Sequence, residues 1–205
     1  MQQLFSGKLR FKDENGEDYA DWEEKKLGEV GKIITGSTPP TSNLEYYIGN
    51  RLFVSPADIN EARFVLSTKT TLTDLGFEKG RKLKKGAVLF VCIGSTIGKV
   101  AIAGYDCITN QQINAIEANS LNCNDFIFSL LELNAGNIKL LAGVQAVPQI
   151  NKTDFSNFSF MFPSLPEQQK IANFLSNIDV KIENTNQQIY QMQDFKKGLL
   201  QQLFV

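Results

Sequence analysis

Five basic residues stand within seven positions of this sequence, and cations at such close spacing can bind phosphate. They are Lys79, Arg81, Lys82, Lys84 and Lys85. A run of this kind can neutralise the backbone of a nucleic acid and position it without reading its sequence. Lysines that precede a strand are also common as solvated loop charges. The run alone therefore leaves a phosphate site and a solvated loop both open.

Side-chain amides form a second set of candidate residues, suited to reading bases. Asn110 to Gln112 supply three adjacent amides, and the stretch from Gln145 to Lys152 supplies more. An Asn or Gln side chain can pair bidentately with adenine in the major groove of DNA. Amides in loops are usually only solvated, so the interest of these residues depends on the basic run in the same chain.

Two patterns invite an enzymatic interpretation, and both are incomplete. The segment Gly94 to Lys99 resembles a phosphate-binding loop, but it has one residue too few between its glycines and has Val100 where Ser or Thr would bind magnesium. Thr38-Pro-Pro-Thr41 resembles the active-site motif of amino-methyltransferases, but it lacks the amide or carboxylate and the aromatic residue of that motif. The chain has no histidine, the commonest general base. We therefore expect no catalytic residue and no metal site.

Charge and cysteine content restrict the class of protein further. The formal net charge is −1, from 21 basic and 22 acidic residues, so any contact with DNA must come from a local patch or from partner subunits. Cys92, Cys107 and Cys123 are odd in number and widely spaced, which fits reduced core residues and not a disulfide framework. No apolar run is long enough to cross a membrane and no secretion signal is visible, so we expect a cytoplasmic protein with no membrane partner.

Short elements precede one long helix. Residues 27–34 form a short strand or helix, and Asn124 is a possible N-cap for a helix over 125–133. Phe158, Phe160 and Phe162 alternate with Ser159 and Met161, as in a half-buried strand. The other strands are expected at 52–54, 64–66, 87–93 and 99–103.

The C-terminal region carries a heptad pattern. A helix from Glu167 to Leu203 would be about 55 Å long and would project from a domain of this size. An amphipathic helix packed on its own domain would show a similar stripe, but the length of the seam favours a partner helix. The expected dimer interface consists of Ile171, Leu175, Ile178, Ile182, Thr185, Ile189, Met192, Lys196, Leu199 and Leu203.

An ordered series of motifs resembles the specificity subunit of type I restriction–modification enzymes. The series runs from Trp22 through Lys26-Leu-Gly-Glu29, Thr35-Gly-Ser-Thr-Pro39, Leu83 to Phe90, Gly94 to Lys99, Asn110-Gln-Gln112 and Val147-Pro-Gln-Ile150. It ends with Phe162-Pro-Ser-Leu-Pro-Glu-Gln-Gln-Lys-Ile171 and the long helix. The entry Pro-x-Leu-Pro-Glu-Gln into the heptad is its most specific part.

The resemblance implies an α+β fold, with a mixed, largely β target recognition domain followed by a long C-terminal helix that forms an antiparallel coiled coil. It implies three regions: the end of a preceding spacer and a linker at 1–21, the recognition domain at 22–165, and the spacer helix at 166–205. The helix would serve dimerisation and methyltransferase docking. A full-length subunit of the family has two such units, and each domain reads half of a bipartite DNA sequence.

The same resemblance assigns roles to the candidate residues. Those expected to position phosphates are Lys79, Arg81, Lys82, Lys84, Lys85, Lys99 and Lys152. Those expected to read bases are Thr35, Ser37, Thr38, Asn110, Gln111, Gln112, Gln145 and Gln149. No cofactor is expected in this chain, because S-adenosylmethionine would belong to a methyltransferase subunit and ATP with magnesium to a restriction subunit.

The chain departs from the family pattern by holding one unit. Its opening, Met1-Gln-Gln-Leu-Phe5, repeats the Gln201-Gln-Leu-Phe204 near its end, so we expect a natural half-subunit or the second half of a longer protein. Two chains paired through their helices would restore the two-domain layout on double-stranded DNA. A coiled-coil adaptor without DNA affinity and an anti-restriction decoy that binds the methyltransferase subunit remain as alternatives.

Overall fold

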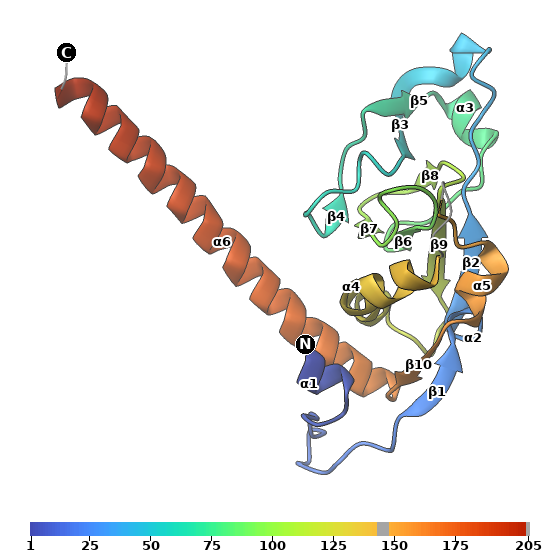
Figure 1. Cartoon of the computed structure of the whole chain (residues 1–205), viewed down its shortest axis with the longest axis vertical. Helices are drawn as coiled ribbons and strands as arrows, with labels where there is room; N and C mark the ends of the chain where they lie inside the picture. Colours follow the sequence, from blue (N-terminus) through green and yellow to red (C-terminus); the bar gives the residue numbers. More distant parts are fainter. Residues whose placement is uncertain (143–147, 204–205) are drawn as a thin grey trace.

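The computed structural model describes residues 1–142 and 148–203. A mixed domain of sheets and short helices carries one long helix, α6 (Leu165–Leu203), which leaves one end of the domain and projects away from it (Figure 1). The expected fold class, a mixed domain followed by a long C-terminal helix, is confirmed.

A five-stranded sheet forms the centre of the domain, in the order β2-β9-β6-β7-β4. Its neighbours pair antiparallel, except for the parallel pair of β4 and β7. The strands are β2 (Gly31–Thr35), β9 (Ile113–Ala118), β6 (Val88–Val91), β7 (Val100–Ala103) and β4 (Phe64–Val65).

The central strand β6 separates two hydrophobic clusters. Val88 and Phe90 face a cluster that includes Phe126 of α4 (Asn124–Leu141), whereas Leu89 and Val91 belong to a second cluster on the other face. All four β6 residues are buried, which is why the sequence shows an unbroken apolar run there. The strand expected over 87–93 is confirmed over its central residues.

A three-stranded sheet lies at the end of the domain farthest from the start of α6 (Figure 1). Its order is β5-β3-β8, with β3 antiparallel to β5 and parallel to β8. The elements here are β3 (Tyr47–Val54), β5 (Thr70–Leu72), β8 (Cys107–Thr109), the 3-10 helix Leu44–Tyr46 and α3 (Asp74–Glu78).

The remaining elements lie near the start of α6 and along strand β2 (Figure 1). Strand β1 (Glu23–Lys26) pairs antiparallel with β10 (Ser159–Phe162). In β10, Ser159 and Met161 are exposed while Phe162 is buried, so the predicted alternation is confirmed. The helices here are α1 (Gln2–Phe5), α2 (Leu27–Val30) and α5 (Lys152–Asn157).

Helix α4 differs from its prediction at both ends. Cys123 is the N-cap, while the Asn124 side chain accepts a hydrogen bond of 2.9 Å from the Ala118 amide, so Asn124 does not cap the helix. The helix continues through Gly136 to Leu141, and Ile138 is buried in the core. This burial beyond Gly136 explains why a glycine in that turn does not end the helix.

Helix α6 divides into two parts. In the proximal segment (165–176), Ile171 and Leu175 are 1% and 6% exposed and pack into the core of the same chain, beside α4. In the distal segment (177–202), every residue except Gly198 is exposed. Ile171 and Leu175 were expected on a dimer seam. This prediction is wrong, because α4 lies beside this part of the helix and both side chains pack in the core of the same chain.

Two polar residues fix the start of α6 to the domain. The buried Glu167 carboxylate accepts hydrogen bonds from the Arg10 guanidinium at 2.8 and 3.1 Å and from the Trp22 indole at 3.1 Å. The buried Gln168 amide accepts from the Cys123 backbone at 2.9 Å and donates to the Pro163 carbonyl at 2.9 Å. The Pro-Glu-Gln entry of the sequence is therefore an anchor that joins the N-terminal residues, α4 and α6.

None of the helices in the described part of the chain combines the length and the apolar character needed to cross a bilayer.

Candidate nucleic-acid interface

Backbone hydrogen bonds bring the segment after β2 against the turn between β8 and β9. The Gly36 amide donates to the Ile113 carbonyl at 3.0 Å, and the Ser37 amide donates to the Thr109 carbonyl at 2.8 Å. A Cβ atom at residue 36 would lie 2.0 Å from the Asn110 carbonyl oxygen, so only glycine allows this approach. The hydroxyl residues 35–38 and the amide residues 110–112, distant in sequence, therefore form one surface.

A third segment joins the same surface. The Cys92 amide donates to the Gln112 carbonyl at 2.7 Å, and the Gly94 amide donates to the Pro148 carbonyl at 3.0 Å. Gln149 then forms a β-bridge with Ile93. We call residues 35–38, 93–94, 110–112 and 148–149 the loop cluster. It contains all the base-reading candidates except Gln145, which lies outside the described residues.

Several candidates support the loop cluster from within. The Thr35 hydroxyl donates to Asn114 Oδ1 at 2.6 Å, and the buried Asn114 amide donates to Cys92 Sγ at 3.2 Å. Burial raises the pKa of the Cys92 thiol to about 12, so the thiol stays protonated at neutral pH. Asn110 Nδ2 donates to Gln112 Oε1 at 2.9 Å, which holds the turn. These side chains shape the surface and do not face solvent freely.

Three side chains of the loop cluster are exposed. Thr38 and Gln111 are both exposed, and the Thr38 hydroxyl donates to Gln111 Oε1 at 2.7 Å. This contact leaves the Gln111 Nε2 hydrogens and the second lone pair of Oε1 available, which are the groups that a bidentate contact to adenine needs. Gln149 is also exposed. The exposed amides are therefore the chemically competent part of the cluster.

Within the basic run, Arg81 is the residue in direct contact with the loop cluster. Its backbone amide donates to Ser37 Oγ at 3.0 Å, and its guanidinium Nη1 donates to the Thr35 carbonyl at 2.8 Å. The guanidinium has further donors, and the residue is exposed. A cation therefore stands at the edge of the amide surface.

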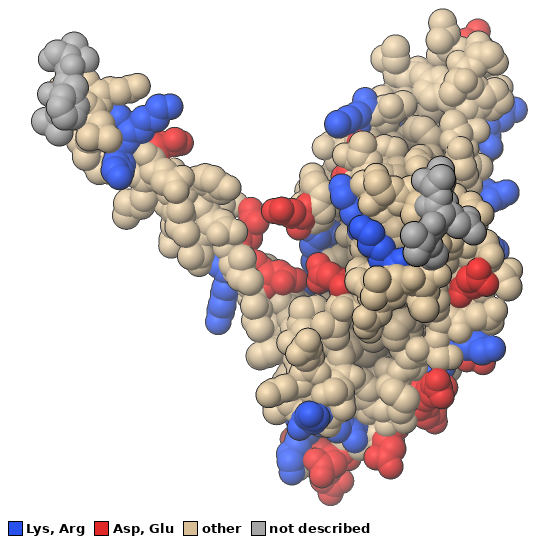
Figure 2. Space-filling model, in the orientation of Figure 1, with Lys and Arg blue, Asp and Glu red and all other residues tan. Residues whose placement is uncertain are grey.

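The other residues of the basic run each have neighbours of their own. Lys82 Nζ lies 2.5 Å from Glu78 Oε1, and Lys79 lies over the Tyr46 ring at 6.0 Å. Lys84 and Lys85 are exposed, and their backbone amides bond Glu117 and Asp106. Basic and acidic side chains are interspersed over the domain face in Figure 2. A common field of these five cations stays a prediction.

The two remaining lysines lie apart from the run. Lys99 Nζ donates to the Ile59 carbonyl at 2.7 Å, which occupies part of its hydrogen-bonding capacity. Lys152 is the first residue of α5 and is exposed.

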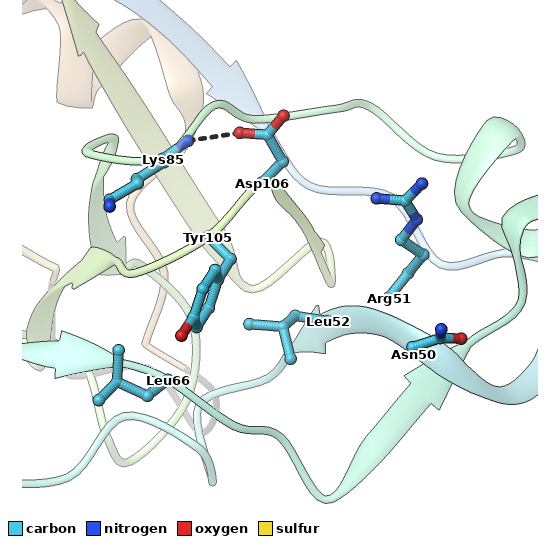
Figure 3. A pocket seen from close by; sticks show the side chains of 7 residues that line it. All are labelled: Asn50, Arg51, Leu52, Leu66, Lys85, Tyr105 and Asp106. Atoms are coloured by element: carbon cyan, nitrogen blue, oxygen red, sulfur yellow. Dashed lines mark hydrogen bonds between the residues drawn. The ribbon is translucent and has the colours of Figure 1, made fainter.

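A surface hollow near Lys85 was not expected from the sequence. It has a volume of about 500 Å³, with Tyr105 and Leu66 on one side and Arg51 and Asn50 on the other (Figure 3). Its lining residues are Asn50, Arg51, Leu52, Leu66, Lys85, Tyr105 and Asp106. They come from four separate segments. The parallel pairing of β3 with β8 brings two of them together, and the Lys85 amide bonds Asp106. No spacing in the sequence signals such a site.

Among the described residues there is no group of three or more His, Cys, Asp or Glu side chains that could hold a metal ion.

Known proteins show the same sequence pattern and the same fold. A family model described as the type I restriction modification DNA specificity domain matches residues 19–193. The MjaIX specificity subunit of Methanocaldococcus jannaschii is 28% identical over 174 residues, which are 82% of this chain and 40% of the relative. The HindI specificity subunit of Haemophilus influenzae is 27% identical over 173 residues, 80% of this chain and 38% of that protein.

Solved structures agree on the fold. The HsdS subunit of Thermoanaerobacter tengcongensis superposes with a TM-score of 0.63 at 23% identity, covering 80% of this chain and 38% of that subunit. The S subunit of M. genitalium gives a TM-score of 0.62 at 19% identity, with 86% of this chain and 42% of that subunit covered. The chain thus spans about two fifths of the length of these relatives. Because the family model covers most of the sequence, the chain belongs to the family of type I restriction modification DNA specificity domains.

Proposed function

We propose that this chain recognises one half of a bipartite sequence in double-stranded DNA, as the specificity component of a type I restriction–modification system. The observation that carries the proposal is the convergence of three distant loops on one surface with exposed amides, beside Arg81. Gln111, oriented by Thr38, would read a base edge, and the exposed Gln149 of the same loop cluster would be a second candidate for such a contact. Arg81, with the exposed lysines of the basic run, would position the phosphates.

In this proposal the chain performs recognition without chemistry. Adenine methylation would belong to a methyltransferase subunit that uses S-adenosylmethionine, and restriction to a subunit that uses ATP and magnesium. Partner subunits would also supply part of the positive field that a chain of net charge −1 lacks. The complex would act on DNA in the cytoplasm.

The distal segment of α6 would pair with the same segment of a second chain. Ile178, Ile182, Ile189, Met192 and Leu199 are between 38% and 71% exposed. An apolar stripe of this length on an isolated helix is unfavourable in water, and antiparallel pairing would bury it. A symmetric dimer of this kind favours a DNA site whose halves are inverted repeats. A chain that sediments as a monomer at micromolar concentration would contradict the pairing.

Co-expression with a methyltransferase subunit, followed by mapping of methylated adenines, tests the proposal. Methylation at one inverted-repeat site is the expected result. A complex without methylation would identify a decoy, and the absence of a complex would leave a coiled-coil adaptor; either result overturns the proposal.

The variant Gln111→Ala sharpens this test at the level of one residue. It should reduce methylation at the preferred site by about tenfold or more and relax the preference at one position of each half-site, because a bidentate contact contributes about 1–3 kcal/mol of discrimination. Asn15→Ala, which removes an exposed amide from an N-terminal turn, is the matched control and should leave the site unchanged.

A further inference from the structure

One arginine joins the domain to α6 at the point where the helix leaves it. Arg63 immediately precedes β4, and its guanidinium makes two ion pairs in different directions. Nη2 lies 2.7 Å from Asp125 Oδ1 on α4, and Nη1 lies 2.8 Å from Asp179 Oδ2 on α6. The Arg63 side chain is 10% exposed, while the two aspartates are about half exposed. The arginine is therefore the enclosed centre of a contact between domain and helix.

Arg63 is held in place before it reaches the helix. The Ile102 amide of β7 donates to the Arg63 carbonyl at 2.8 Å, which fixes its backbone to the central sheet. Its guanidinium carbon lies 4.6 Å from the centre of the Phe128 ring and 5.9 Å from that of Phe64. A planar guanidinium stacked in this way has little freedom and presents its donors in fixed directions. The position of Asp179 relative to the domain is therefore well defined.

The ion pair with Asp179 extends the helix attachment by one turn. Among residues 165–202 of α6, Leu175 is the last buried side chain, and Asp179 follows it by four residues on the same helix face. Beyond this point the helix moves away from the domain, and acidic side chains of helix and domain face each other across the gap (Figure 2). Arg63 thus contacts α6 at the point where the helix leaves the domain.

Without Arg63, acidic side chains of the domain would repel Asp179 of α6. Glu132 of α4 has its pKa raised by burial and by the Asp179 charge, with Arg63 acting in the opposite direction, so these carboxylates share one local field. Removal of the guanidinium would leave Asp125, Glu132 and Asp179 as like charges on the two sides of the gap. The arginine turns a repulsive contact into an attractive one.

A small change in the angle of α6 at Asp179 produces a large displacement at the far end of the helix. From residue 179 to residue 203 it extends by about 36 Å at ~1.5 Å per residue. A rotation of about 5° at Asp179 would move the far end by roughly 3 Å. Successive base pairs of DNA are ~3.4 Å apart. A variation of a few degrees in the helix angle would therefore change the distance between two domains joined through their helices by about the length of one base pair.

We propose that Arg63 is a positioning residue that fixes the angle between the domain and α6, and through it the number of base pairs between the two half-sites. The part concerning DNA rests on the proposed function. The part concerning the angle rests only on the contacts of this chain. The two parts are tested by separate measurements.

Distances between spin labels on the domain and on the distal segment test the angle. Exposed residues 61 and 187 serve as label sites after exchange to cysteine in a chain with Cys123→Ser, mixed with an excess of unlabelled chain. Arg63→Gln and Asp179→Asn should both broaden the distance distribution and shift it to longer values. Asp179 is half exposed, so Asp179→Asn leaves the fold intact even where Arg63→Gln does not. Asp194→Asn, at an exposed aspartate farther along α6, is the matched control and should change nothing.

Methylation of a DNA library tests the consequence for spacing. The library keeps both half-sites and varies the number of base pairs between them. The parent chain should direct methylation at one spacing, and Asp179→Asn should raise methylation at spacings one base pair longer or shorter by about tenfold. An unchanged distance distribution would overturn the proposal that Arg63 fixes the angle of α6. A broadened distribution with an unchanged preference for one spacing would overturn its role in the spacing of the half-sites. A parent chain that directs no methylation would overturn the proposed function. The label distances would still test whether Arg63 fixes the angle of α6.

Discussion

The two parts of α6 carry the same heptad pattern and have opposite surroundings. In the proximal segment, Ile171 is 1% exposed against its own domain, whereas Ile189 in the distal segment is 49% exposed. Both are isoleucines on the same stripe of one continuous helix. The difference between them comes from what lies beside the helix and not from the helix itself. A heptad therefore indicates that a stripe is to be covered, without indicating whether the same chain or another one covers it.

Polar residues differ between the two segments in the same way. In the proximal segment, Glu167 and Gln168 are buried, and their bonds go to distant parts of the chain. In the distal segment, the Thr185 hydroxyl donates to the Lys181 carbonyl of its own helix at 2.8 Å. The proximal polar groups are thus part of the folded domain, while Thr185 is satisfied locally and remains compatible with a partner.

The largest expected difference comes from the same truncation made in both segments. Ile171→Ala should lower the free energy of unfolding by about 2–5 kcal/mol, because it opens a cavity in a core that α4 and α6 share. Ile189→Ala should change the stability of the isolated domain by about 0.5 kcal/mol or less. Urea unfolding followed by the fluorescence of Trp22, the only tryptophan of the chain, measures both values at a concentration below dimerisation.

The same pair of variants should exchange roles in an association assay. Ile189→Ala should weaken self-association measured by sedimentation, and Ile171→Ala should not do so under conditions where it remains folded. Equal effects of both substitutions on unfolding would show that the distinction between the segments is incorrect.

A smaller effect is expected at the polar anchor of the proximal segment. Gln168→Ala removes the acceptor of the Cys123 amide and the donor to the Pro163 carbonyl, which should cost about 1–3 kcal/mol in local stability. Labelling by a maleimide should report this opening at Cys123, which is half-buried. The Cys92 and Cys107 thiols are buried, and burial raises the pKa of each to about 12, so they contribute little thiolate below pH 9.

The labelling rate of Cys123 should rise by about tenfold in Gln168→Ala, in line with ~1.4 kcal/mol per factor of ten. Gln187→Ala, an exposed glutamine of the distal segment, is the control and should leave the rate unchanged. Labelling of Cys92 or Cys107 at the same rate as Cys123 would show that the whole domain unfolds and not only the anchor.

Periodic features of the fold were predictable, and contacts between distant segments were not. The strand at β6, the alternation in β10 and the length of α6 follow from residue patterns that burial imposes locally. The end of the buried stripe at Leu175 could not be predicted, because the heptad continues unchanged past it. It depends on where α4 packs in the folded domain, which the local sequence pattern does not determine.

The candidate site shows the same limit. The amides of 110–112 could be selected by residue type, but their union with residues 35–38 depends on the pairing of β2 with β9. Arg63 carries no motif, since its partners Asp125 and Asp179 lie 62 and 116 residues away in the sequence. Pairing and turns of this kind are decided by the whole fold.

The smallest expected effect lies at Thr185, a polar position on the exposed stripe. Thr185 lines a shallow apolar groove with Ile189 and Met192, and its hydroxyl already has a partner in its own helix. Thr185→Val keeps the shape of the side chain and removes that hydroxyl, so the isolated chain should be almost unaffected. Burial of the added methyl group in a paired helix should strengthen the dimer by about 1 kcal/mol, a factor of about five in Kd.

Sedimentation at several concentrations measures that change, with Thr153→Val in the exposed first turn of α5 as the control. Polar residues at seam positions often lower affinity while they fix the register of a coiled coil. A tighter dimer would therefore place residue 185 in the seam and give its hydroxyl a role in register. A dimer of unchanged affinity would remove residue 185 from the shared seam, and the distal segment would then need a different partner surface to cover Ile182 and Ile189.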